Sequence, residues 1–138
     1  MDLRKKTEMI VVHCAATKPS MDIGASEIKK WHVDDNGWDD IGYHYIIKRG
    51  GLVEVGRPEA FKGAHAPAAN SKSIAICLVG GMSEDGDAEN NFTLQQFLSL
   101  KDLIKRLLMT NSNIKEIVGH YDIQDNKPNC PGFNLKEW

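Results

Sequence analysis

The sequence predicts an α/β protein built as one domain over residues 1–138, with a central mixed β-sheet flanked by helices. The chain has 138 residues, 41% of them hydrophobic and 26% charged, a composition typical of one globular domain. Short apolar segments rich in β-branched residues alternate along it with segments of helical periodicity. This alternation favours helices packed on a mixed sheet in two or three layers. No repeat or low-complexity tract divides the chain further.

The strands are predicted from short apolar runs that end at turn signals. The expected strands are residues 9–14 (MIVVHC), 43–48 (YHYIIK), 52–55, 73–79 (SIAICLV) and 116–119. Arg49-Gly50-Gly51 forms a tight turn between the second and third of these, which predicts a hairpin.

Two helices are predicted. Residues 26–34 have apolar side chains at helical spacing and are followed by Asn36-Gly37, a stop signal. Residues 93–111 carry a wide apolar stripe with a period of 3.6 residues. Thr93 and Gln96 at its start have the spacing of a capping box.

Charge and hydropathy argue against several classes of partner. Seventeen basic and nineteen acidic side chains give a formal net charge of −2, so no overall positive field favours nucleic acid. No apolar run approaches the roughly 20 residues of a membrane helix. The first residues lack the apolar stretch of a secretory signal. We therefore expect a protein made in the cytoplasm, without a nucleic-acid or membrane partner. We also expect a monomer.

The three cysteines cannot all pair within one chain, and without an export signal we expect no disulfide framework. Cys77 lies within a buried strand, and Cys14 directly follows His13, which places the two on opposite faces of their strand. We expect Cys14 and Cys77 in the core. Cys130 lies in a polar loop, where a cysteine has little packing value.

Two histidines and this cysteine could form a metal site. His13 and His120 each lie at the end of a predicted strand, where α/β sheets commonly place their sites. Together with the Cys130 thiolate they would make three zinc ligands with an open fourth position, as in catalytic zinc sites. The ligands have no local spacing motif, so the pattern alone indicates zinc only weakly. A thiol hydrolase with Cys130 as nucleophile and His120 as base is the alternative.

The remaining histidines differ in their surroundings. His32 lies on a predicted helix, and we expect no role for it in a site. His44 follows Tyr43 in a strand, so if Tyr43 faces a cleft, His44 is a buried, hydrogen-bonded residue. His65 lies in the long irregular segment 56–72 and is a candidate to line a substrate groove.

Several motifs occur in the order known from one protein family. They are Ile10–Ser20 (IVVHCAATKPS), Gly37-Trp38, Gly42–Gly51 (GYHYIIKRGG), Gly63–Ala66 (GAHA), Ser73–Gly81 (SIAICLVGG), Asn91-Phe92-Thr93 and Cys130–Phe133 (CPGF). From about residue 9 to the C-terminus, the chain resembles the zinc-dependent N-acetylmuramoyl-L-alanine amidases. Within this family, which includes the peptidoglycan recognition proteins, it is most similar to the small phage lysozymes of the T-odd coliphage type.

The resemblance implies a zinc site in a surface groove, with one Zn²⁺ per chain held by His13, His120 and Cys130. It implies hydrolysis of the amide between N-acetylmuramic acid and L-alanine in peptidoglycan, as in endolysins of phage or prophage origin. Tyr43 matches a tyrosine required for hydrolysis. Tyr43 and Lys127 are the expected donors to the transition-state oxyanion, and one of them or His65 protonates the departing amine.

The chain departs from the family pattern at three places. The phage relatives have a catalytic lysine two residues before the ligand cysteine, where this chain has Pro128; Lys127, one residue earlier, is the expected substitute. Relatives that recycle the cell wall have a glutamate in place of Cys77, so we expect no carboxylate base there. The sequence ends at Trp138, and we expect no separate wall-binding module.

The resemblance also suggests other functions and partners. Some relatives bind peptidoglycan without cutting it, but these usually lack the ligand cysteine, which is present here as Cys130. Phage relatives can bind the phage RNA polymerase, and the residues of this chain decide neither for nor against that partner. An enzyme of this type would act on the cell wall after its release from the cytoplasm.

Overall fold

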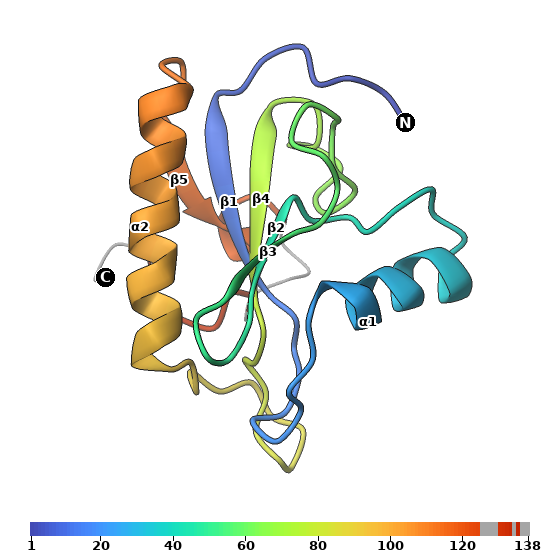
Figure 1. Ribbon diagram of the computed structural model, residues 1–138, viewed down its shortest axis with the longest axis vertical. Helices are drawn as coiled ribbons and strands as arrows, with labels where there is room; N and C mark the ends of the chain where they lie inside the picture. The colour runs from blue at the N-terminus through green and yellow to red at the C-terminus, as the bar shows by residue number, and fades with distance from the viewer. Residues whose placement is uncertain (125–129, 134, 136–138) are drawn as a thin grey trace.

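The computed structural model describes residues 1–124, 130–133 and 135, and its fold is the predicted mixed sheet flanked by helices (Figure 1). The five strands lie in the order β3-β2-β4-β1-β5. The strands are β1 (Met9–Cys14), β2 (Tyr45–Ile47), β3 (Val53–Val55), β4 (Ser73–Leu78) and β5 (Glu116–Gly119). Only the β2–β3 hairpin is antiparallel; β2, β4, β1 and β5 run parallel to one another. The carboxyl ends of these four parallel strands therefore lie at the same edge of the sheet.

Helix α2 (Leu94–Thr110) covers one face of the sheet (Figure 1). The Thr93 side chain accepts a hydrogen bond from the Gln96 backbone N–H, and the Gln96 side chain accepts one from the Thr93 N–H. This is the predicted capping box. The core beneath α2 consists of Ile10, Val12, Ile47, Ile74, Ile76, Leu78, Leu100, Leu103, Ile104 and Leu107. Among the described residues, no helix combines the length and apolar character needed to cross a membrane.

The opposite face of the sheet is covered by helix α1 (Ala25–Lys30) and by loop residues, which makes three layers (Figure 1). Ile28 of α1 packs with Ile46 and Cys77, and Ala66 and Ala69 pack on β1. The helix predicted over 26–34 is therefore present. Its second half, Trp31–Asp35, is wound as a π-helix.

Candidate functional site

His13 and His120 come together because their strands are parallel neighbours in the sheet. Val12 of β1 is in register with Gly119 of β5, so His13 and His120 follow directly at the same edge. Both side chains are buried, with exposed fractions of 0% and 6%. The predicted placement of both histidines at strand ends is confirmed.

Cys130 reaches this edge through the segment that follows β5. The backbone N–H of Tyr121 donates to the Cys130 carbonyl at 2.9 Å, and the Cys14 N–H donates to the Cys130 sulfur at 3.2 Å. The close approach requires glycine at 119, because a Cβ atom there would overlap the Tyr121 ring and lie 2.9 Å from Pro131 Cδ. Backbone contacts on two sides thus hold Cys130 against the two histidines.

The three side chains present a compact donor set. One ligand atom from each of His13, His120 and Cys130 lies within 4.8 Å of the others. The Nδ1 atoms of the histidines are 3.0 Å apart, and Cys130 Sγ is 4.0 Å from His13 Nδ1. A tetrahedral zinc ion with ordinary bond lengths would separate two nitrogens by about 3.3 Å, and a nitrogen from a sulfur by about 3.6 Å. The donor types suit zinc, and these two spacings lie within a few tenths of an ångström of the ideal values.

The orientation of His120 suits a metal ligand. Its Nε2 lies against the side-chain oxygen Oε1 of Gln124, which can only accept a hydrogen bond. In the neutral ring the proton is therefore on Nε2, and the unprotonated Nδ1 faces His13 and Cys130. A hydrogen bond from the ring nitrogen that does not bind the metal commonly fixes the tautomer of a metal-binding histidine.

The environment of Cys130 does not favour a free thiolate. A hydrogen bond with the Cys14 side chain and burial raise the pKa of the Cys130 thiol. A cysteine nucleophile normally needs the opposite shift. A metal cation would supply the charge that stabilises the thiolate.

A cavity of about 420 Å³ opens beside the donor set. Its walls include the aromatic and polar side chains of His32, Trp38, Tyr43, His65, His120 and Gln124. Tyr43 and His65, both predicted to face a cleft, lie in these walls. Their roles in catalysis or substrate binding remain predictions.

Tyr43 lies next to His13, with 5.1 Å between the ring centroids of the two side chains. Burial, and then the adjacent Cys77 thiol, raise the pKa of the Tyr43 hydroxyl well above its ordinary value. The hydroxyl therefore keeps its proton at neutral pH and can donate a hydrogen bond.

His65 is held by its loop and by the neighbouring His13. The Asn70 side chain accepts hydrogen bonds from the His65 and Ala66 backbone N–H groups, both at 3.0 Å. The His65 Nδ1 atom lies 2.8 Å from His13 Nε2. Burial lowers the pKa of His65 to about 3, so its imidazole is neutral at physiological pH.

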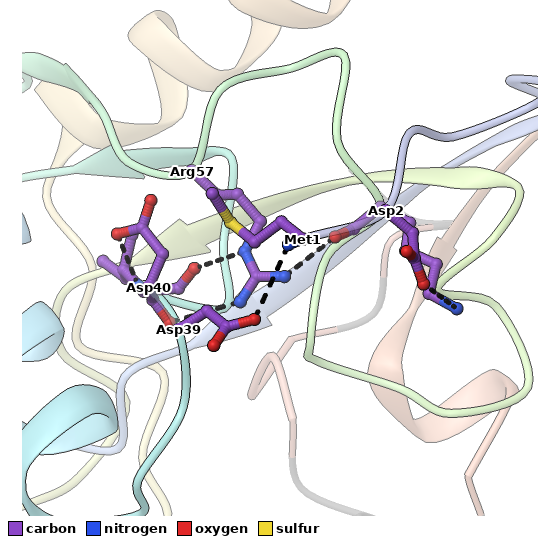
Figure 2. Close-up of polar contacts among 7 residues, drawn as sticks. Met1, Asp2, Asp39, Asp40 and Arg57 are labelled. Atoms are coloured by element: carbon purple, nitrogen blue, oxygen red, sulfur yellow. Dashed lines mark hydrogen bonds and ion pairs between the residues drawn. The ribbon is translucent and has the colours of Figure 1, made fainter.

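Arg57 ties together the segments that lead to Tyr43 and His65 (Figure 2). Its guanidinium donates to the Asp40 and Ile41 carbonyls, before Tyr43, and to the Lys62 carbonyl, before His65. The chain begins close by, where the Met1 ammonium lies 3.7 Å from the Asp39 carboxylate (Figure 2). One buried cation therefore sets the relative position of two walls of the cavity.

Two residues lie elsewhere than the sequence reasoning placed them. His32 lines the cavity, where its Nδ1 accepts the Gly42 N–H and its ring contacts Trp38 and Tyr43. Cys14, expected in the core, is only half-buried and borders Cys130, because the strand ends there and alternation no longer governs its neighbours.

Other assignments agree with the structure or lie outside it. His44 is fully buried and hydrogen-bonded to the backbone of Phe61 and Ala75, as predicted. Cys77 is fully buried in β4, also as predicted. Lys127 lies outside the described residues.

The sequence analysis did not predict Gln124, whose side chain is the partner of His120 Nε2. The four-residue spacing between His120 and Gln124 was the available signal.

Comparison with known proteins identifies the class. The family description "N-acetylmuramoyl-L-alanine amidase" matches residues 3–133, and the chain belongs to this family. Within it, the chain is 46% identical to the endolysin of Enterobacteria phage T3 and 44% identical to that of Escherichia phage T7. Each match covers 98% of this chain and 87% of the relative. Among solved structures, the N-acetylmuramoyl-L-alanine amidase LysC from Clostridium intestinale URNW shares 32% identity at a TM-score of 0.78, covering 94% of this chain and 78% of that one.

Proposed function

We propose that this protein is a zinc-dependent N-acetylmuramoyl-L-alanine amidase of the endolysin type, from a phage or prophage. It would cleave the amide between the lactyl group of N-acetylmuramic acid and L-alanine in peptidoglycan. The observation that carries the proposal is the donor set of His13, His120 and Cys130 beside an open cavity. Membership of the amidase family supports it.

An amide is a poor electrophile, and water is a poor nucleophile at neutral pH. When bound, zinc supplies a Lewis acid for the carbonyl and lowers the pKa of water towards about 7. Two neutral imidazoles and one thiolate would leave a net charge of +1 at the site. The negative donor is Cys130, and the neutral ones are His13 and His120.

Tyr43 is the proposed hydrogen-bond donor to the amide oxygen as negative charge develops on it. Its hydroxyl stays protonated, and its ring lines the cavity beside His13. Donors placed in this way commonly contribute about 10²–10³ in turnover. Lys127 is the proposed second donor. The departing amine needs a proton, for which Tyr43, Lys127 and His65 are the candidates.

Two other functions are less well supported. A module that only binds peptidoglycan has no need for three converging metal donors. A thiol hydrolase needs a Cys130 thiol of lowered pKa, whereas the surroundings of Cys130 raise it.

The metal assignment is tested by replacing the one negative donor. Cys130→Ser should lose most of its zinc and its activity while remaining folded, because a poorly ionised hydroxyl cannot replace a thiolate on zinc. Metal analysis of purified protein and circular dichroism measure the two effects. Cys77→Ala is the matched control: it removes another buried thiol and should keep one zinc per chain. Full zinc occupancy in Cys130→Ser would remove Cys130 from the site.

A further inference from the structure

A chain of hydrogen bonds runs from the start of strand β4 to the first proposed ligand. Ser73, the first residue of β4, is fully buried. Its hydroxyl lies 2.7 Å from the Ala69 carbonyl and 3.0 Å from His65 Nε2. The other nitrogen of His65, Nδ1, lies 2.8 Å from His13 Nε2. Ser73 and His65 therefore each have a hydrogen-bond partner on both sides within this series of bonds.

The chemistry of the groups fixes the direction of these bonds. The Ala69 carbonyl can only accept, so the single Ser73 hydroxyl proton points to it. The Ser73 oxygen must then accept its second hydrogen bond, which His65 donates from Nε2. In a neutral imidazole only one nitrogen carries a proton, so His65 Nδ1 is an acceptor.

The same reasoning extends to His13. Because His65 Nδ1 accepts, His13 donates to it from Nε2. The proton of His13 is then on Nε2, and its Nδ1 is unprotonated. That atom is the one that faces His120 Nδ1 at 3.0 Å and Cys130 Sγ at 4.0 Å.

We propose that Ser73 and His65 are positioning residues that hold His13 in the tautomer and ring orientation required of a metal ligand. The inference rests on the proposed function, in which His13 binds zinc. It assigns to a serine and a second histidine the part that a carboxylate or a backbone carbonyl often plays behind a zinc-bound histidine. It also removes His65 from the candidates for protonating the departing amine, because both of its ring nitrogens are engaged within the protein.

The first test is nitrogen NMR of the imidazoles in the zinc-loaded wild-type protein, which needs no substitution. We expect His65 and His13 each to carry a proton on Nε2 and none on Nδ1. A proton on Nδ1 of His65 would reverse the direction of the chain and overturn the proposal.

The second test measures the zinc dissociation constant by competition with a chromogenic chelator. His65→Leu removes the acceptor for His13 and should weaken zinc binding about 10- to 100-fold, as loss of such partners typically does. His65→Asn places an amide oxygen near the position of Nδ1 and should recover most of that loss. Ser73→Ala should weaken binding in the same direction, on the order of 10-fold.

Ser99→Ala is the matched control for Ser73→Ala. Ser99 also donates to a backbone carbonyl, that of Gly51 at 2.6 Å, but it lies on α2 on the other face of the sheet. The zinc affinity of the Ser99→Ala protein should stay within about twofold of wild type, as expected for a substitution away from the site.

The outcomes separate this inference from the function on which it rests. A wild-type protein that binds no zinc would contradict the proposed function itself. A wild-type protein that binds one zinc, together with a folded His65→Leu variant of unchanged affinity, would overturn only the positioning role. Equal losses in His65→Leu and His65→Asn would also overturn it, because a hydrogen-bond acceptor would then not matter.

Discussion

Tyr43 and His44 are neighbours in the sequence but have different surroundings. Tyr43 lines the cavity, and burial raises the pKa of its hydroxyl further above neutral pH. His44 is fully buried and is enclosed by hydrogen bonds with the backbone of Phe61 and Ala75. The two side chains, which directly precede β2, therefore point into different surroundings: one into the cavity and the other into the interior of the protein.

Removing only the Tyr43 hydroxyl tests its proposed role. Tyr43→Phe should lower kcat about 10²–10³-fold, as the loss of one oxyanion donor typically does. The ring remains and the hydroxyl is not a ligand, so zinc content and muropeptide binding should change little. Turnover on purified muropeptides, with zinc stoichiometry measured in parallel, gives the answer. A Tyr43→Phe enzyme with wild-type turnover would refute the assignment.

His44 should make stability depend on pH. Burial lowers its pKa from 6.5 to about 4 in the folded protein, so between these values the unfolded chain binds a proton that the folded protein does not. Its contribution to stability is therefore complete above pH 6.5 and declines as the pH falls towards 4. We expect a loss of about 2 kcal/mol between pH 7.5 and pH 5.

Urea unfolding at several pH values measures this effect. His44→Gln has no titrating group at this position, so its free energy of unfolding should fall less over the same range. Identical pH dependence in the two proteins would show that His44 titrates normally when folded.

The site could be predicted in part at the level of single residues. The family motifs and the strand ends indicate His13, His120, Cys130 and Tyr43. The proximity of His32 and Cys14 to the site could not be predicted, because it depends on where the π-helical turn and the segment around Cys130 lie in space. These are contacts between residues far apart in the sequence.

At the scale of elements, the order of the strands in the sheet creates the site. All five strands were predicted within two residues of their observed ends, since apolar runs and turn signals are local. Their order, β3-β2-β4-β1-β5, is not local, and it is this order that places β1 beside β5. The sequence therefore indicates two histidines at strand ends, whereas the structure shows that they meet.

Gln96 joins helix α2 to the sheet and is the clearest test of packing at this scale. It is fully buried, and its side chain donates to the carbonyls of Ile47 and Val79 at 3.1 and 2.8 Å. Gln96→Leu leaves these buried acceptors without that donor and should lower the free energy of unfolding by about 1–3 kcal/mol. Chemical denaturation measures the change.

The neighbouring Gln95 provides the control, because it is exposed on the same turn of α2. Gln95→Leu should change stability by no more than about 0.5 kcal/mol. A Gln96→Leu protein as stable as Gln95→Leu would show that the helix is held by its apolar stripe alone.

At the scale of the whole molecule, side chains from residues 56–72 and from described residues that follow β5 meet at the proposed metal site. Residues 56–72 bring His65 to the cavity, and the segment after β5 brings His120 and Cys130. The length of residues 56–72 predicted that they serve a site, but their path could not be predicted, since they lack periodicity. The sheet supplies the edge at which His13, His120 and Cys130 meet.

The activity of the whole protein is tested most directly by mass spectrometry of purified muropeptides after incubation, with and without a metal chelator. We expect free stem peptide beginning with L-alanine, no product in the presence of chelator, and recovery when zinc is restored. A cut at any other bond would contradict the amidase assignment. Undiminished cleavage with chelator, abolished instead by thiol alkylation, would show that Cys130 is a nucleophile and not a zinc ligand.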